Sequence, residues 1–161
     1  MEVIIETPKG SRNKFKYEPK TQKLKLSKVL PQGMIFPYDF GYVPSTKGED
    51  GDPLDILVLM DEPTFPGCLL ECRLIGIVEA EQTEEGETQR NDRLIGVAQQ
   101  SLVYSDIRKI GDLNPIILKQ IEAFLLNYPR VEGREVKLLG RKGPDGALKL
   151  VRAASIHKHA V

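Results

Sequence analysis

The sequence has no tryptophan, only two cysteines and two histidines, and no net charge across its 161 residues. Cys68 and Cys72 are too few for a secreted, disulfide-stabilised fold, and no neighbouring ligand completes a zinc site with them, so we expect reduced thiols. No run of about 18 apolar residues is present, which predicts no membrane-spanning segment. The first residues lack the basic flank and apolar core of a signal peptide. These absences predict a soluble, cytoplasmic protein.

The composition is that of an ordinary folded domain, with 40% apolar and 29% charged residues. A chain of this length can bury one core and is short for two, so we expect a single domain over residues 1–161. Aromatic residues make up only 6%. Together with zero net charge and no tryptophan, this argues against the basic, base-stacking surface of a nucleic-acid binder.

Charges of opposite sign are separated along the chain. Eight basic residues lie between Lys9 and Lys28, opposed only by Glu18. Six acidic residues and no basic one lie in residues 49–62, and a second acidic patch covers residues 79–87. Such runs are most often solvated surfaces. If the fold brings them together, they suit a polyanion and its accompanying metal ions.

The hydrophobic pattern predicts a mainly β protein. Strands are expected at residues 3–6, 14–18, 24–29, 34–38, 56–60, 69–78 and 93–98. A helix is expected from Pro115 to Tyr128, capped by Asn114 and stopped by Pro129. A final pair of strands is expected at residues 136–139 and 147–151, with a possible short helix after Arg152. Many short strands punctuated by Gly and Pro favour a closed or strongly curled barrel.

The segment Asp50-Gly51-Asp52-Pro53-Leu54-Asp55 carries the clearest chemical signal. Three neighbouring carboxylates raise one another's pKa values when partly desolvated, and a bound Mg²⁺ relieves that cost. An exposed acidic turn is the simple alternative. An EF-hand loop does not fit, because Asp55 stands where that loop needs glycine. No phosphate-binding glycine loop or nucleophile elbow is present. The segment therefore favours metal-assisted phosphoryl transfer to water.

This hexapeptide, followed by an apolar strand, resembles the signature of the family I soluble inorganic pyrophosphatases. Four more blocks occur in the family's order, at residues 5–8, 15–18, 36–42 and 65–67, so the resemblance spans residues 3 to about 139. It implies an α+β, mainly β fold with an OB-like five-stranded barrel and flanking helices. It also implies hydrolysis of pyrophosphate with several Mg²⁺ ions, for which Mn²⁺ or Co²⁺ could substitute. A homo-oligomer, a hexamer in the family, is expected.

The resemblance also implies roles for individual residues. Asp50 and Asp55 would hold the metal pair that activates water, and Asp52 would accept the proton of that water. The remaining expected metal ligands are Glu6, acting through water, and Asp92. The expected substrate-binding residues are Lys16, Lys28, Tyr42, Arg93 and Tyr128.

Each assignment has a simpler structural alternative. Glu6 could cap an edge strand, Lys16 could be a solvated lysine, and Tyr128 could serve only the core.

Several positions depart from the family's pattern. Lys28 stands for an arginine, Phe40 for a tyrosine and Pro129 for a lysine. The acidic loop is also altered, and it leaves open whether Asn91, Asp92 or Glu81 completes the metal site. These changes keep a second hypothesis in play, that of a weakened relative that binds pyrophosphate or metal as a sensor or structural partner.

Overall fold

A computed structural model describes residues 1–156 of the chain. The described elements are, in order, β1 (Glu2–Thr7), β2 (Asn13–Glu18), β3 (Lys23–Val29), β4 (Asp39–Tyr42), β5 (Asp55–Leu59), β6 (Leu69–Glu84), β7 (Glu87–Arg90), β8 (Arg93–Ala98), the 3-10 helix η1 (Ile110–Asp112), α1 (Pro115–Arg130), β9 (Glu135–Lys142) and α2 (Pro144–Ala154). None of the helices in this part of the chain is both long and apolar enough to cross a membrane.

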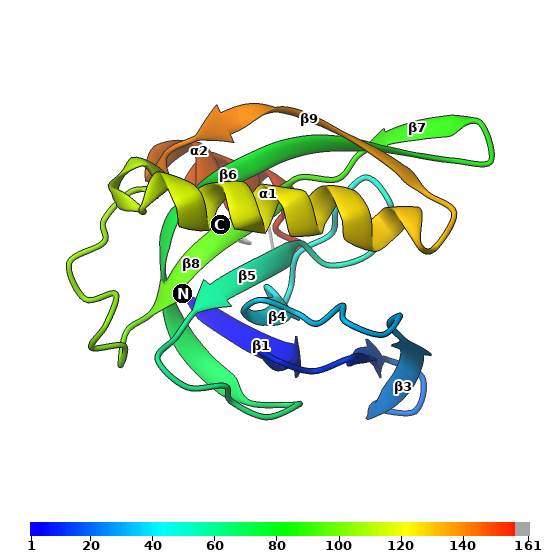
Figure 1. The fold of residues 1–161 in the computed structure, drawn as a ribbon, viewed down its shortest axis with the longest axis horizontal. Coiled ribbons are helices and arrows are strands. Elements are labelled where there is room, and N and C mark those ends of the chain that lie inside the picture. The colour runs from blue at the N-terminus through cyan, green and yellow to red at the C-terminus, as the bar shows by residue number, and fades with distance from the viewer. Residues whose placement is uncertain (157–161) are drawn as a thin grey trace.

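Five strands form a closed ring (Figure 1). Hydrogen bonding runs in the order β1-β4-β5-β8-β6 and returns from β6 to β1. The β5–β8 pair is parallel, and the other pairs of the ring are antiparallel. The long strand β6 continues beyond the ring and pairs there with β7 and β9, while β2 and β3 form a separate hairpin. This mainly β architecture with two flanking α-helices agrees with the predicted fold class.

Alternate residues of the central strand β5 enter two different hydrophobic clusters, as its period-two geometry requires. Leu57 and Leu59 pack in a cluster that contains the apolar face of α1. Ile56 and Val58 pack in the other, which contains Ala147 of α2. All four side chains are fully buried. The start of β5, which carries Asp55, is therefore held rigidly between two packed layers.

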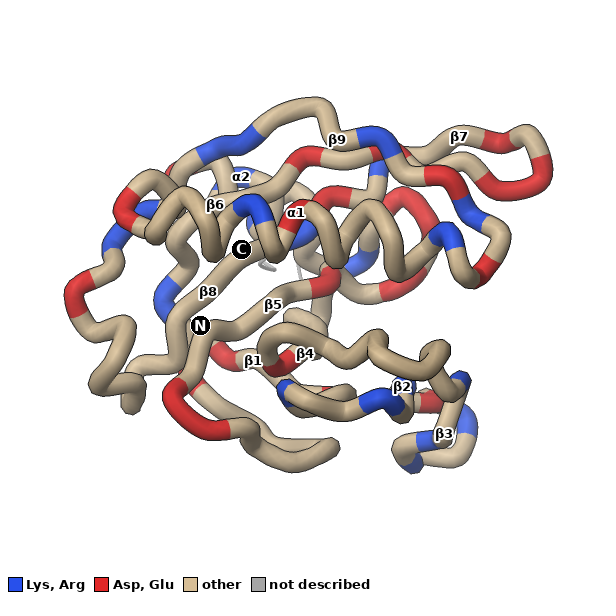
Figure 2. The backbone as a smooth tube through the Cα atoms, in the orientation of Figure 1, with Lys and Arg blue, Asp and Glu red and all other residues tan. Residues whose placement is uncertain are grey.

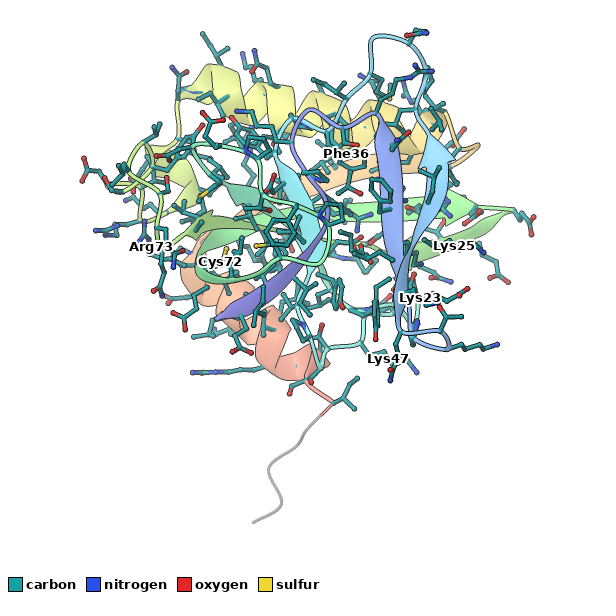
Figure 3. All side chains as sticks on the ribbon, turned by 90° about the horizontal axis from the view of Figure 1, so that it is seen from below. Lys23, Lys25, Phe36, Lys47, Cys72 and Arg73 are labelled. Carbon is teal, nitrogen blue, oxygen red and sulfur yellow. The ribbon has the colours of Figure 1, made fainter. Side chains whose placement is uncertain are left out.

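The strand expected at residues 34–38 is absent, and β4 begins just after it, at Asp39. Pro37 has no backbone N–H to give to a strand ladder, which disfavours pairing here. Phe36 instead buries its ring against Phe124 and Tyr128 of α1, with ring centroids 5.2 and 5.4 Å away. Figure 3 shows Phe36 beside α1. The apolar character of residues 34–38 therefore reflects the packing of Phe36 against helix α1 and not a strand.

The C-terminal prediction is wrong in a second way: residues 147–151 belong to helix α2, not to a strand. Pro144 occupies the first turn, and Ala147, Leu150, Val151 and Ala154 recur at helical spacing to face the ring. Strand β9 therefore pairs with β6 instead. No separate helix follows Arg152 within the described residues: α2 ends at Ala154 and Ser155 forms an isolated bridge with Thr46. The rest of that prediction, beyond residue 156, lies outside the described residues.

Helix α1 is confirmed, but it does not stop at Pro129. It runs to Arg130 and is capped by the Asn114 side chain, which accepts a hydrogen bond from the N–H of Ile116. Pro129 lies in the last turn of α1, where it cannot donate the usual backbone hydrogen bond to the preceding turn, and the helix ends one residue later. The Pro129 carbonyl accepts hydrogen bonds from the N–H groups of Glu132 and Arg134, which fold the chain back towards β9.

Gly41 allows β4 to approach β1 closely. A Cβ at this position would lie 2.1 Å from the carbonyl oxygen of Ile4. We expect Gly41→Ala to lower the free energy of unfolding by about 1–3 kcal/mol or more, because the clash is with backbone that cannot rotate away. Urea unfolding measures this. Gly111→Ala, with nothing within 4 Å of the added Cβ, is the control; equal losses in both variants would contradict the role given to Gly41.

Candidate active site

A cavity of about 660 Å³ opens between the β2–β3 hairpin, the segment before β5 and the β6–β7 hairpin. Figure 2 shows basic residues along β2 and β3 and acidic residues around the tip of β7, at the same end of the molecule. Four lining carboxylates form what we call the acidic wall: Glu6, Asp50, Asp52 and Asp55. Facing groups form the basic wall: Lys14, Lys28, Arg134 and Tyr128.

The turn before β5 presents Asp50 and Asp52 to the cavity. Gly51 adopts φ +86°, a left-handed conformation that glycine tolerates and most residues do not. The Asp50 carboxylate accepts a hydrogen bond of 3.0 Å from the N–H of Asp52, and the Asp52 carbonyl accepts one of 2.7 Å from Gly48. These local bonds fold the signature segment into a compact loop with its aspartates on one side.

Asp55 opens β5 beside Arg93, which opens the parallel neighbour β8. The Arg93 guanidinium lies 3.1 Å from the Asp55 carboxylate, and both side chains are largely buried. Burial raises the pKa of Asp55, and Arg93 opposes that rise. The Arg93 guanidinium also donates a short hydrogen bond to the Asn91 side-chain oxygen. Asp55, predicted as a metal ligand, and Arg93, predicted as a substrate-binding residue, are thus in direct contact.

Glu6 reaches the cavity because β1 carries a bulge. Ile5 pairs with Gly41 and Thr7 with Phe40, which leaves Glu6 without a partner on β4. Bulges commonly redirect a side chain beside a functional site. The Glu6 carboxylate accepts a 2.7 Å hydrogen bond from the N–H of Tyr17, and burial raises its pKa to about 7. Glu6 therefore connects β1 to β2 through Tyr17 and also lines the cavity.

Tyr42 and Tyr17 line the cavity on either side of this carboxylate. Their rings stack with centroids 6.1 Å apart. Burial, and then the charge of Glu6, raise the pKa of Tyr42 to about 12. The Tyr42 hydroxyl therefore stays protonated at neutral pH and can donate a hydrogen bond.

The basic wall is organised around Glu132, in the turn between α1 and β9. Lys14 and Lys28 are direct cross-strand partners and would repel each other. The Glu132 carboxylate lies 3.9 Å from the Lys14 ammonium and 3.1 Å from that of Lys28. Its other oxygen lies 3.5 Å from Arg134. No donor meets hydrogen-bond geometry at Glu132 within residues 1–156, so these contacts act through charge.

Tyr128 contributes a buried polar group to the same wall. Its side chain is 5% exposed and its hydroxyl has no hydrogen-bond partner among the described residues. Burial, reinforced by Glu132, raises the Tyr128 pKa, so the hydroxyl keeps its proton. The Lys14 ammonium lies 4.9 Å from the ring centroid. A buried donor that lines a cavity without a partner suits an oxygen atom of a ligand.

Lys16, predicted to contact phosphate, lines the cavity but is bound to one of the aspartates. Its ammonium donates a 2.7 Å hydrogen bond to the Asp52 carboxylate and so belongs to the acidic wall. Although partial burial lowers the Lys16 pKa, the hydrogen bond and charge of Asp52 outweigh burial and raise it overall.

Asp92, a predicted metal ligand, does not line this cavity but lines a neighbouring hollow together with Asp50, Asp55 and Asn91. Its carboxylate accepts hydrogen bonds of 2.9 Å from Arg90 and from the N–H of Ala80. Asn91 lines the cavity instead, whereas Glu81 lies 3.9 Å from Lys137 on the outer sheet. Of the three alternatives left open by the sequence, Asn91 is the one that lines this cavity, and which of them holds a metal ion stays a prediction.

The acidic wall suits a hard divalent cation by its chemistry, because carboxylate and amide oxygens are the donors such ions prefer. Its conformation differs from a closed coordination shell. Among residues 1–156, no three Asp, Glu, His or Cys side chains converge on one point. Asp52 turns to Lys16 and Asp55 to Arg93, so the wall must rearrange slightly to surround an ion.

The sequence did not predict three residues that form or support the basic wall, namely Lys14, Glu132 and Arg134. Lys14 was one of eight basic residues in its segment, and neither its burial nor its contact with Tyr128 is visible from periodicity. Glu132 follows the predicted helix and looks like a solvated charge. A cross-strand lysine pair opposite a lone glutamate is a signal that only tertiary structure supplies.

Solved structures share this fold. Inorganic pyrophosphatase from Thermus thermophilus superimposes with a TM-score of 0.88 at 36% identity, over 96% of this chain and 88% of that one. The enzyme from Helicobacter pylori gives 0.87 at 30% identity, over 96% and 90%. The fold is therefore that of the inorganic pyrophosphatases.

Sequence comparison identifies the family directly. The inorganic pyrophosphatase family profile matches residues 3–159. The sequence is 38% identical to the inorganic pyrophosphatase of Thermus thermophilus over 94% of this chain and 86% of the relative. For that of Methanosarcina acetivorans the identity is 35%, over 94% and 88%. The chain belongs to the inorganic pyrophosphatase family, whose members use a divalent metal cofactor.

Glu6 gives the fold a pH dependence of definite sign. Because its folded pKa of about 7 exceeds the ordinary 4.5, the folded state holds an extra proton between those values. The contribution of Glu6 to the free energy of unfolding is therefore greatest below pH 4.5. It falls as the pH rises towards 7, by at most about 1.4 kcal/mol per pH unit. We expect Glu6→Gln to remove this decline in urea unfolding with EDTA present. Parallel curves for the two proteins from pH 5 to 8 would rule the effect out.

Glu132 is expected to stabilise the basic wall. Glu132→Gln leaves Lys14, Lys28 and Arg134 without their counter-charge, so we expect a loss of roughly 1–3 kcal/mol in the free energy of unfolding at pH 7.5. Chemical denaturation measures the loss. The matched control is Glu135→Gln, an exposed neighbour, which should change stability by less than about 0.5 kcal/mol.

Proposed function

We propose that this chain hydrolyses inorganic pyrophosphate to two orthophosphates, with Mg²⁺ as its divalent cofactor. The observation that carries the proposal is the opposition of two walls of unlike charge across one cavity. One wall offers oxygen donors for a hard cation, and the other offers ammonium, guanidinium and hydroxyl groups for phosphate oxygens. A diphosphate with its cations matches both walls at once.

On the acidic wall, Asp50, Asp55 and Glu6 are the proposed holders of the cation, together with Asn91 in place of Asp92. A divalent cation held there lowers the pKa of a water molecule and neutralises charge on phosphate oxygens. Asp52 lies at the cavity edge in the same loop, half exposed, and accepts the proton of the attacking water.

On the basic wall, Lys14 and Lys28 face the cavity and stabilise the charge that develops on the leaving phosphate. The buried Tyr128 hydroxyl donates to a phosphate oxygen and thereby gains the partner it lacks in the described residues. Arg93 and Tyr42 line the same cavity between the walls. Arg93 can shift from Asp55 to phosphate when a cation replaces it on that carboxylate.

The departures from the family's pattern fall on the cavity lining, so they bear on rate and not on fold. Phe40 lines the cavity but belongs to the core cluster and offers no hydroxyl. Lys28 keeps its charge but cannot bind phosphate in the bidentate way of an arginine. Arg134 lies on the same wall as these positions and supplies one further guanidinium.

Two further expectations stay predictions. One is the cytoplasmic location, expected from the lack of membrane-spanning and signal segments, and the other is the homo-oligomeric, hexameric assembly that the resemblance implies. The alternative of a sensor or structural partner that binds pyrophosphate or metal without turnover is separated from the enzyme by the assay below.

We expect the chain to release orthophosphate from pyrophosphate in the presence of Mg²⁺, and Asp52→Asn and Asp55→Asn each to lower turnover at least about 100-fold, as loss of a proton acceptor or metal ligand does. Phosphate release measured by colorimetry tests this. Asp106→Asn, an exposed aspartate that does not line the cavity, should retain full activity. If the chain binds pyrophosphate but releases no phosphate, the result contradicts the enzyme and supports the hypothesis of a sensor or structural partner.

A further inference from the structure

The three lysines of the β2–β3 hairpin that line the cavity divide between its two walls. Lys14 and Lys28 face Glu132 on the basic wall. Lys16 instead crosses to the signature loop, where its ammonium lies 2.7 Å from Asp52. It brings a positive charge into the acidic wall, where the proposed function requires divalent cations.

The environment of the Lys16 ammonium is acidic beyond its direct partner. Glu6 and Asp55 both attract it, in addition to Asp52. Conversely, the charge of Lys16 favours the ionised form of Glu6. One ammonium thus compensates part of the repulsion among three carboxylates of the acidic wall.

An ammonium and a divalent cation compete for the same carboxylate oxygens. They also repel each other when held a few ångströms apart, because both charges are positive. The Lys16 and Asp52 side chains are 51% and 54% exposed, so the pair can open at modest cost and gives little stability by itself. Its influence is therefore on cation binding rather than on folding.

We propose that Lys16 is a built-in counter-cation of the acidic wall: it takes a place beside Asp52 that a divalent cation would otherwise share, and it weakens divalent-cation binding by this chain. The inference rests on the proposed function in one respect, that the acidic wall binds such cations. Lys16 acts as a positioning residue here. It sets how many divalent ions the cavity holds and how tightly.

The test measures Mn²⁺ binding to the full chain in the absence of substrate. Electron paramagnetic resonance quantifies the free ion, and calorimetry measures the binding directly. For Lys16→Gln we expect either one additional Mn²⁺ per chain or an approximately tenfold lower Kd, which corresponds to about 1.4 kcal/mol. Lys16→Arg keeps the charge and should bind like the wild type. Urea unfolding of each variant verifies that it is folded.

The matched control is Lys25→Gln. Lys25 is the cross-strand partner of Lys16, but its side chain is 71% exposed and does not line the cavity. It should leave Mn²⁺ binding unchanged. Two results would overturn the inference. One is an equal gain in Mn²⁺ binding in Lys25→Gln, because the effect would then come from the overall charge of the hairpin. The other is no gain in Mn²⁺ binding in Lys16→Gln.

Pyrophosphate hydrolysis is measured separately on the same preparations. Tighter Mn²⁺ binding by Lys16→Gln supports the counter-cation role even if no chain releases phosphate, in which case only the proposed function fails. Hydrolysis by the wild type with identical Mn²⁺ binding in the two proteins supports the function and rejects the role of Lys16.

Discussion

The parallel pairing of β5 with β8 is the constraint on which the site depends. It places Asp55 and Arg93, the first residues of these strands, side by side between two packed hydrophobic clusters. Desolvation makes a lone carboxylate there costly, and the guanidinium 3.1 Å away offsets that cost. The signature loop before β5 is therefore anchored at Asp55, and its other two aspartates line the cavity.

Charge is balanced locally on each wall instead of across the cavity. Glu132 holds the basic wall together from within, and Lys16 and Arg93 do the same for the acidic wall. Each wall is thus stable before a ligand arrives. A doubly charged ion and a polyanion can bind by displacing weak internal pairs, which is less costly than desolvating bare charges.

The sequence predicted the parts of the site that lie in short, chemically marked segments. The aspartates of the signature loop, Lys28, Arg93, Tyr42 and Tyr128 all line the cavity as expected. Asp92 does not, and its carboxylate accepts hydrogen bonds from Arg90 and from the N–H of Ala80. Lys14 and Glu132 escaped notice because their importance arises from a contact between distant segments. The strand/helix error at residues 147–151 has a similar origin: a five-residue segment with four apolar residues is ambiguous until the surface that it covers is known.

Strand β6 runs for 16 residues and serves two structures in succession. Its first half closes the ring against β1 and β8, and its second half carries β7 and β9, which border the cavity. A register shift near Gly76 marks the transition; there, a Cβ would lie 2.5 Å from the Lys142 carbonyl oxygen. One continuous backbone therefore joins the strand pairs that close the ring to the acidic β6–β7 hairpin at the cavity, so the placement of this hairpin depends on the same strand that closes the ring.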